Sequence, residues 1–433
     1  MVGGCDNARP MPGLFPRAVA VATSLLAVVA IVILAFRGTG PGVVLRPAAS
    51  PPASLAPTPT PSTTASPTPD AAQVFAQIEA QVRALRGLAA PSLAPPAIIT
   101  RAQLAAELRS RFDHDYPPAR RAADNVMFRA LGLLTASQDI GELQLRLLSG
   151  QVIGFYDNET KRMSLVSESG IGPGVKITYA HEYTHALQDH AFGLASLQLS
   201  APGEDDRDLA RLSLVEGDAT VLMLQWALDH MTPQELLGVS QGPAPDLTGI
   251  PAWMVDDLEF PYTAGEQFVT NLRASGGTSA LDAAFRAPPA STEQVLHPDK
   301  YKSREAPLKV AAPALAAGLG GGWRDLPADT LGEAMVRFWL QGLGDANPLA
   351  QQAADGWGGD RLVAATGPGG AFAVAWRLAW DSSADAAQFE QGYRAAAPHL
   401  KVSGRLVRVS DRETLVVQGS SPAIVDRAVA ALS

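Results

Sequence analysis

The stretch ITYAHEYTHALQDH, residues 177–190, contains three of the seven histidines of a 433-residue chain. Within it, residues 181–185 read HEYTH, which has the spacing H-E-x-x-H. On a helix, His181 and His185 lie one turn apart on the same face, so both imidazoles can reach one ion. Glu182 is rotated by about 100° from His181, which keeps its carboxylate near the ion without making it the obvious ligand. The stretch therefore predicts a metal-binding helix.

A third ligand has to come from another part of the chain, because a catalytic zinc ion takes three protein ligands and keeps one open position. A metzincin site needs a histidine where this chain has Ala191, and the only cysteine, Cys5, precedes the first apolar segment. Glu216 lies on the next strongly helical segment, and an antiparallel second helix would bring it back over the ion. The acidic residues within 204–208 compete for this role.

The pattern HEYTH…VEGDA resembles the gluzincin clan of zinc metallopeptidases over about residues 174–225. The resemblance implies a zincin-like fold, zinc held by His181, His185 and Glu216, and Glu182 as the general base. GFYDNETKR and STEQVLHPDKY are similar to segments of bacterial membrane-anchored proteins that carry H-E-x-x-H.

The chain departs from the gluzincin pattern near the glutamate ligand. Gluzincins often have an aspartate one turn after that ligand, where this chain has Thr220. The nearby Asp218 is two residues along the helix, so we expect it to point away from the ion.

Peptide hydrolysis also needs a hydrogen-bond donor for the tetrahedral intermediate. The candidates are His297, Tyr301 and Tyr262, in that order. A helix-end position also explains His297, and core packing also explains the two tyrosines. Asp189, one turn after His185, either orients that ring or is solvated, whereas His190 lies off the ligand face and is expected to be structural or at the surface.

The periodicity predicts an α+β fold, which the resemblance specifies as a mostly helical zincin-like domain with a small β-hairpin over residues 71–345. Helices are expected in the segments that begin at Ala71, Thr100 (as N-cap), Arg120, Gly174, Glu204 and Pro261, and strands at 151–157 and 162–168. Gly265 marks a position where another element approaches closely, and Ser291 and Gln294 have capping-box spacing.

The last part of the chain, residues 346–433, is predicted to be a small β-α-β-β-α unit. Strands are expected at 371–380, 404–410 and 414–420, with helices at 383–396 and 421–432. The Gly-rich GWGGDR at 356–361 is interpreted as a turn, because it lacks the Lys-Ser/Thr of a phosphate-binding loop.

Residues 18–36 contain no charge and are long enough to cross a bilayer core of about 30 Å as a helix. We expect a retained signal-anchor with residues 1–17 in the cytoplasm, and the alternative is a cleaved signal peptide. Residues 37–70 are rich in Pro, Ala, Ser and Thr, which predicts an extended linker. A single-pass membrane protein with an extracytoplasmic catalytic domain is therefore expected.

The predicted activity is that of a zinc metallopeptidase, which hydrolyses peptide or protein substrates near the membrane and is held to the lipid bilayer by its N-terminal helix. Net charge is −9 and no long basic run is present, so we expect no nucleic-acid partner. One alternative is a zinc-dependent cell-wall amide hydrolase. The other is a non-catalytic surface binding or scaffold protein, in which a fourth protein ligand would close the metal site.

Overall fold

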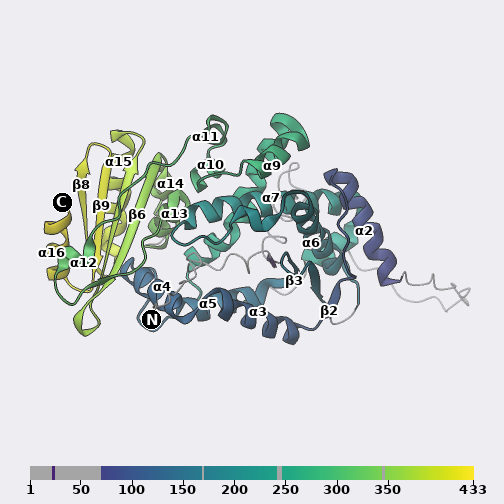
Figure 1. Ribbon diagram of the computed structural model, residues 1–433, viewed down its shortest axis with the longest axis horizontal. Helices are drawn as coiled ribbons and strands as arrows, with labels where there is room; N and C mark the ends of the chain where they lie inside the picture. Colours follow the sequence, from purple (N-terminus) through teal and green to yellow (C-terminus); the bar gives the residue numbers. More distant parts are fainter. Residues whose placement is uncertain (1–21, 25–69, 168–169, 241–245, 344–346) are drawn as a thin grey trace, which may run out of the picture.

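A computed structural model describes residues 22–24, 70–167, 170–240, 246–343 and 347–433 (Figure 1). The fold is α+β, as the sequence predicts. A helical body separates a small four-stranded sheet at one end of the molecule from a five-stranded antiparallel sheet at the other (Figure 1).

Little of the predicted membrane segment belongs to the described residues. Ala22–Ser24 form a short strand, β1, that pairs antiparallel with β3, so these three residues are extended where the sequence predicts helix. The rest of 18–36, the predicted cytoplasmic segment 1–17 and the linker up to residue 69 lie outside the described residues. Among the helices that are described, none has the length and apolar character needed to cross a bilayer.

Three helices precede the hairpin of the small sheet where the sequence predicts them. They are α2 (Ala71–Arg86), α3 (Arg101–Asp115) and α4 (Pro118–Ala130). Thr100 caps α3, because its hydroxyl accepts from the backbone of Gln103 while the Gln103 side chain accepts from the Thr100 backbone at 2.8 Å. A fourth helix, α5 (Ile140–Gln151), was not predicted, and Asp139 caps it.

The small sheet contains the predicted hairpin. Strands β3 (Val152–Asp157) and β4 (Arg162–Val166) pair antiparallel, and β2 (Ala97–Ile99) adds to β4 in parallel. The strand order is β1-β3-β4-β2, so β3 lies between β1 and β4.

Three long helices form the centre of the body. They are α6 (Pro173–Phe192), α7 (Asp205–His230) and α9 (Ala252–Arg286). The short helix α8 (Pro233–Ser240) packs against one of them, α6. The prediction that a helix starts at Pro261 was wrong, because α9 begins at Ala252 and Pro261 lies inside it. A proline in a helix interior lacks one backbone donor, and the apolar residues on both sides of Pro261 are buried enough to hold the helix together.

Five short or medium helices connect the body to the second sheet: α10 (Thr292–Leu296), α11 (Pro298–Ser303), α12 (Leu315–Leu319), α13 (Gly332–Gly342) and α14 (Ala350–Ala354). Ser291 caps α10 by accepting from the Gln294 backbone at 3.2 Å, which confirms the first half of the predicted capping box. The Gln294 side chain accepts instead from the Ala290 backbone at 2.8 Å.

The second sheet has the order β5-β6-β7-β9-β8. Its parts are β5 (Arg324–Asp325), β6 (Trp357–Thr366), β7 (Phe372–Trp380), β8 (Ser403–Ser410) and β9 (Glu413–Gly419), with helices α15 (Ser383–Ala396) and α16 (Pro422–Leu432). The predicted strands and helices of the β-α-β-β-α unit are present, and β5 and β6 extend the sheet.

The interpretation of 356–361 as a turn was wrong, because most of this segment belongs to β6. Its glycines allow another segment to approach closely. The Leu308 backbone donates to the Gly358 carbonyl at 2.7 Å, and a Cβ on Gly359 would lie 2.4 Å from the Leu308 carbonyl oxygen.

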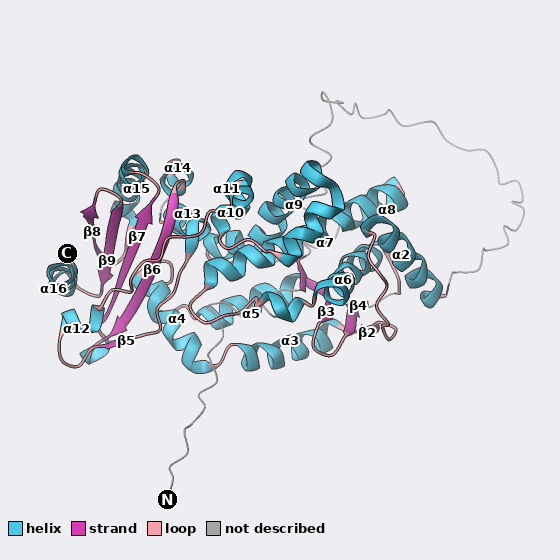
Figure 2. Cartoon of the chain, turned by 45° about the horizontal axis from the view of Figure 1, so that its top comes forward, coloured by secondary structure: helices cyan, strands magenta, loops and turns pink. Residues whose placement is uncertain are grey.

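Helices cover both faces of this sheet (Figure 2). Helices α12 and α16 pack on one face, whereas α13, α14 and α15 lie on the other. On the second face, the Trp339 and Trp376 rings meet edge to face with centroids 5.3 Å apart. This part of the core continues into α3, α4, α7 and α9, so residues on both sides of the predicted boundary at 345/346 share one hydrophobic core.

Candidate metal centre

Helix α6 carries the H-E-x-x-H stretch through the middle of the body. Pro173 occupies its first turn, and Gly193, with a φ of 69°, ends it in the left-handed conformation that glycine adopts without strain. Every residue from Ile177 to Asp189 is buried. The His181 and His185 rings have centroids 4.7 Å apart, and their Nε2 atoms are separated by 3.0 Å.

Glu216 comes from α7, which packs against α6. Its Oε2 lies 3.1 Å from His181 Nε2 and 3.4 Å from His185 Nε2. The competing acidic residues at the start of α7 are used elsewhere. Asp206, for example, accepts from the Thr292 hydroxyl at 2.6 Å. The structure therefore brings Glu216, rather than a residue of 204–208, to the two imidazoles.

The spacing of these three atoms fits a metal ion. Ligands about 2.0–2.1 Å from a tetrahedral zinc ion are about 3.3 Å from one another, and the three edges here measure 3.0, 3.1 and 3.4 Å. Two imidazole nitrogens and one carboxylate oxygen form a usual donor set for zinc. Among the described residues, no fourth His, Cys, Asp or Glu joins the group.

The electrostatics of the group favour a positive charge at its centre. His181, His185 and Glu216 are all fully buried. Burial opposes protonation of His185, but the Glu216 carboxylate raises the pKa of His185 to about 9. Burial likewise opposes ionisation of Glu216, yet His185 and His181 lower its pKa below the usual value. A cation bound here would take the place of the proton that the Glu216 carboxylate otherwise favours on His185.

Glu182 lies beside the group and is held by the small sheet. Its Oε2 accepts a hydrogen bond from the Tyr156 backbone N–H of β3 at 2.7 Å. Its negative charge is one of the causes of the raised pKa of His185, which places the carboxylate close to that ring. The side chain is fully buried.

The partner that orients His185 is Gln188, which the sequence analysis did not identify. The His185 Nδ1 lies 2.9 Å from the Gln188 Oε1. Asp189, which was considered for this role, instead accepts from the Tyr156 hydroxyl at 2.9 Å and pairs with Lys161. His190 is exposed, in agreement with its expected place at the surface. The spacing of three residues along α6 is the signal that could have indicated Gln188.

Of the three candidate donors, the structure brings Tyr262 to the histidines. Its ring centroid lies 6.2 Å from that of His181. Tyr301 packs edge to face on Phe268, and its hydroxyl donates to the Ala287 carbonyl at 2.9 Å.

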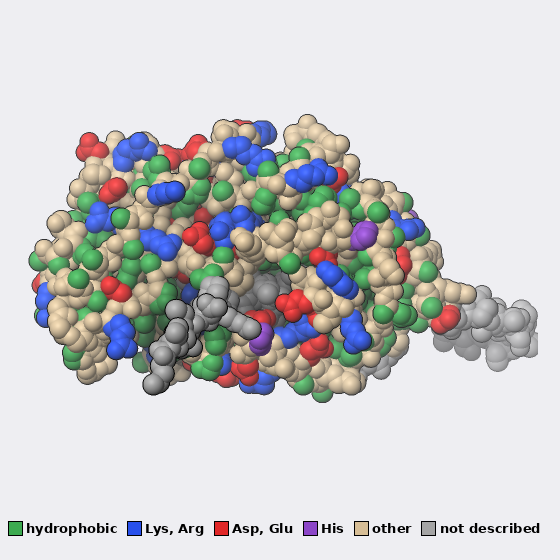
Figure 3. All heavy atoms as spheres, viewed as in Figure 1, with side chains coloured by type: hydrophobic (Ala, Val, Ile, Leu, Met, Phe, Trp, Pro, Cys, Tyr) green, Lys and Arg blue, Asp and Glu red, His purple; other side chains and the backbone are tan. Residues whose placement is uncertain are grey.

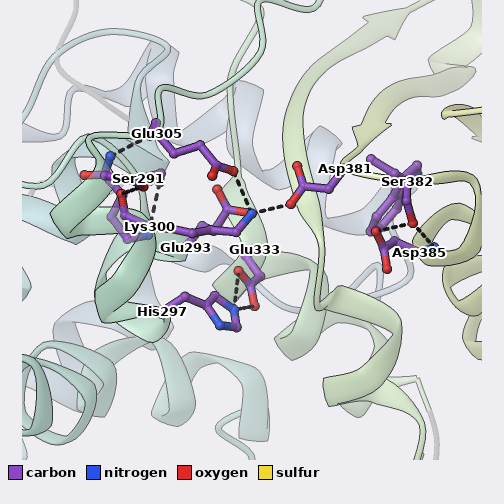
Figure 4. Close-up of polar contacts among 12 residues, drawn as sticks. Ser291, Glu293, His297, Lys300, Glu305, Glu333, Asp381, Ser382 and Asp385 are labelled. Atoms are coloured by element: carbon purple, nitrogen blue, oxygen red, sulfur yellow. Dashed lines mark hydrogen bonds and ion pairs between the residues drawn. The ribbon is translucent and has the colours of Figure 1, made fainter.

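His297 lies with a different set of acidic side chains (Figure 4). Its Nε2 is 2.9 Å from Glu333 Oε1, and this hydrogen bond raises the pKa of His297. Within the described part of the chain, no hydrogen bond, ion pair or ring contact joins His297 or Tyr301 to the three candidate metal ligands.

Lys300 occupies the centre of the neighbouring acidic group in the same view (Figure 4). Its ammonium lies 2.6 Å from Glu293 and 2.8 Å from Glu305, and it also pairs with Asp381 at the end of β7. A side-chain cation therefore occupies the centre of this group, and Lys300 joins α11 to the second sheet.

On the face of the molecule drawn in Figure 3, acidic and basic side chains are interspersed. The same mixing continues across both the helical body and the second sheet on this face.

Comparison with known proteins finds a match to a family model. A family model described as a domain of unknown function, DUF8575, matches residues 322–428. This stretch runs from β5 into α16 and lies after all of the candidate metal ligands. No curated protein and no solved structure matches the chain. The chain is thus similar to DUF8575 over its second sheet.

Proposed function

We propose that this protein is a zinc-dependent hydrolase of peptide bonds, with a gluzincin-type site on a zincin-like fold. One observation carries the proposal: His181 Nε2, His185 Nε2 and Glu216 Oε2 lie 3.0–3.4 Å from one another in a buried site beside Glu182. A set of three ligands supports a catalytic rather than a structural site, because structural zinc is normally closed by four.

In this proposal, His181, His185 and Glu216 would hold a zinc ion, which when bound would act as a Lewis acid and bring the pKa of a water molecule to about 7. Glu182 accepts the proton of the attacking water as general base and passes it to the leaving amine. The Tyr156 backbone N–H fixes one oxygen of Glu182, so the carboxylate does not need to reorient before it takes the proton. Tyr262, next to His181, is the best-placed donor for the developing oxyanion.

The proposed substrates are peptides or proteins near a membrane surface. This part rests on the sequence, in which a 19-residue uncharged segment at 18–36 is followed by a Pro-rich linker. A tether of this kind limits the accessible substrates to those close to the bilayer.

The experiment measures zinc content and peptide hydrolysis for the full chain and for Glu182→Gln. We expect one zinc ion per chain in both proteins and a loss of about 10²–10⁴ in kcat for the variant. The matched control is Glu159→Gln, in the exposed turn between β3 and β4.

Three results would contradict the proposal or redirect it. A chain that binds no zinc, or a Glu182→Gln variant as fast as the wild type, would overturn it. Hydrolysis of cell-wall amides but of no peptide would favour the amide-hydrolase alternative. Zinc binding with no hydrolysis of either class would favour a scaffold.

A further inference from the structure

Behind His185, a chain of buried polar side chains runs away from the candidate metal ligands. The Gln188 Nε2 donates to the Val215 carbonyl and to Asp218 Oδ2, each at 3.0 Å. Gln188 and Asp218 are both fully buried. The Gln188 side chain therefore joins α6 to α7 directly behind the ring of His185.

These contacts determine the orientation of the Gln188 amide. A carbonyl oxygen and a carboxylate can only accept, so the NH₂ group of Gln188 must face them. Its Oε1 then faces His185 Nδ1 at 2.9 Å, and because Oε1 is an acceptor, Nδ1 must carry the hydrogen. The neutral ring consequently has its lone pair on Nε2, the atom that faces His181 and Glu216.

Asp218 is in turn fixed by Arg86, the last residue of α2. The Arg86 Nε lies 3.0 Å from Asp218 Oδ2, and its Nη1 lies 2.8 Å from Asp282 Oδ1 of α9. The guanidinium also lies 5.9 Å from the centroids of the Phe192 and Phe285 rings, which themselves stack. Without Arg86, Asp218 would be a buried carboxylate with no counter-charge.

Asp218 was expected to point away from the ion and so to take no part in the site. It does point away from the ligand atoms, but it acts on His185 through Gln188. His181 has no equivalent support, because its Nδ1 has no hydrogen-bond partner among the described residues. Orientation by hydrogen bonding is therefore concentrated on one of the two imidazoles.

We propose that Arg86, Asp218 and Gln188 are positioning residues that hold His185 in its metal-binding tautomer, so that the docking of α2 sets the affinity of the centre for its metal. The inference rests on the proposed function. Helix α2 begins at Ala71, directly after the predicted linker, and Arg86 lies at its far end. The helix that directly follows the predicted linker in sequence thereby supports the metal centre.

The test measures the zinc dissociation constant of the full chain by competition with a chromophoric chelator. Groups that orient a metal-bound histidine typically change affinity by 10–100-fold when they are removed. We expect Gln188→Leu to weaken zinc binding by about 10–100-fold and Arg86→Met by about 10-fold. Since both residues act through one ring, the double variant should bind zinc about as tightly as the weaker-binding of the two single variants.

The matched control is Gln81→Met. Gln81 also joins α2 to α7, because its Oε1 accepts from the Trp226 indole at 2.9 Å, but it has no link to His185. We expect its zinc affinity to stay within about twofold of the wild type. The visible spectrum of the Co²⁺-loaded protein, which reports ligand geometry, should change for Gln188→Leu and Arg86→Met and stay unchanged for Gln81→Met.

Failure of this inference is distinguishable from failure of the proposed function. A wild type that binds no zinc overturns both. If the wild type binds zinc tightly and neither Gln188→Leu nor Arg86→Met changes the affinity, only the positioning role is overturned. The same conclusion follows if Arg86→Met and Gln81→Met weaken zinc binding equally. If Arg86→Met does not fold, Asp218→Asn replaces it, since that change keeps the side-chain volume, and the same outcomes apply.

Discussion

The backbones of Gly217 and Gly265 are in direct contact where α7 crosses α9. A Cβ on Gly217 would lie 2.2 Å from the Gly265 carbonyl oxygen, and a Cβ on Gly265 would lie 2.2 Å from the Ser213 carbonyl oxygen. The close approach predicted at Gly265 is confirmed. Because Glu216 directly precedes Gly217, this contact sets how far the carboxylate reaches toward the two imidazoles.

Gly265→Ala is expected to push the two helices apart. Overpacking of this kind destabilises by about 1–3 kcal/mol, which urea unfolding of the metal-free chain would measure. We also expect weaker zinc binding, because Glu216 moves with α7. Gly150→Ala in α5 is the control, since no atom lies within 4 Å of its added Cβ and a helical alanine should be neutral or slightly stabilising. An unchanged zinc affinity in Gly265→Ala would show that the contact between α7 and α9 does not position Glu216.

Glu216→Gln should weaken zinc binding by more than the 10–100-fold typical of groups that lie behind the ligands, because it removes the only carboxylate of the three. Metal titration of the full chain provides the measurement. Glu204→Gln, the half-buried acidic residue just before α7, should bind zinc like the wild type. If Glu204→Gln lost zinc and Glu216→Gln kept it, the assignment of the third ligand would be wrong.

Tyr262→Phe is expected to lower kcat by about 10²–10³ with little change in zinc content, which is the usual effect of losing one oxyanion donor. Tyr301→Phe should keep its rate and lose about 1 kcal/mol of stability, because the Tyr301 hydroxyl bonds the Ala287 carbonyl. If Tyr301→Phe lowered kcat and Tyr262→Phe did not, Tyr301 would be the oxyanion donor.

The pair His297–Glu333 should make stability depend on pH. The hydrogen bond to Glu333, with Asp355 and Glu293 nearby, raises the pKa of His297 above its unfolded value of about 6.5. The folded chain thus holds this proton more tightly, so the stabilisation is complete below about pH 6.5 and is lost as pH rises through the folded pKa. Burial raises the pKa of Glu333 as well, so this carboxyl also contributes stability that is lost as pH rises, in a window that starts lower, near the ordinary pKa of about 4.5.

The measurement for this pair compares urea unfolding of the wild type and of His297→Gln at several pH values. The variant should be less stable than the wild type at pH 6, and the difference should shrink by pH 9. His190→Gln is the control, because His190 is exposed. A stability difference that grows with pH would contradict the assigned direction.

The grouping of the three candidate ligands could be predicted because two of them are set by spacing within one helix and the third by the next long helix. His181 and His185 are one helical turn apart, and Glu216 needs only that the next helix returns antiparallel. Thr100 and Ser291 were predictable as caps for the same reason, since each acts within three residues. Local spacing carries the information for the two histidines and the two caps, whereas the choice of Glu216 over the acidic residues of 204–208 needed the packing of α7 against α6.

The remaining features depend on contacts between distant residues. The role of Gln188 is visible only when Asp218 and Arg86 are seen behind it, and Arg86 is 132 residues from Asp218. Glycines at the start of β6 were interpreted as a turn, although they make room for Leu308. The His297–Glu333 pair, 36 residues apart, likewise depends on how α10 and α13 pack.

The shared core has a practical consequence for dividing the gene into fragments. A piece limited to residues 322–428 would keep Trp339 but lose the Leu131 carbonyl that accepts from its indole, and would separate Asp329 from Arg120. Its apolar face would then meet water or other copies of itself. Soluble expression of this piece alone is therefore a poor guide to its role. The residues that match the family model do not form an independently folding unit.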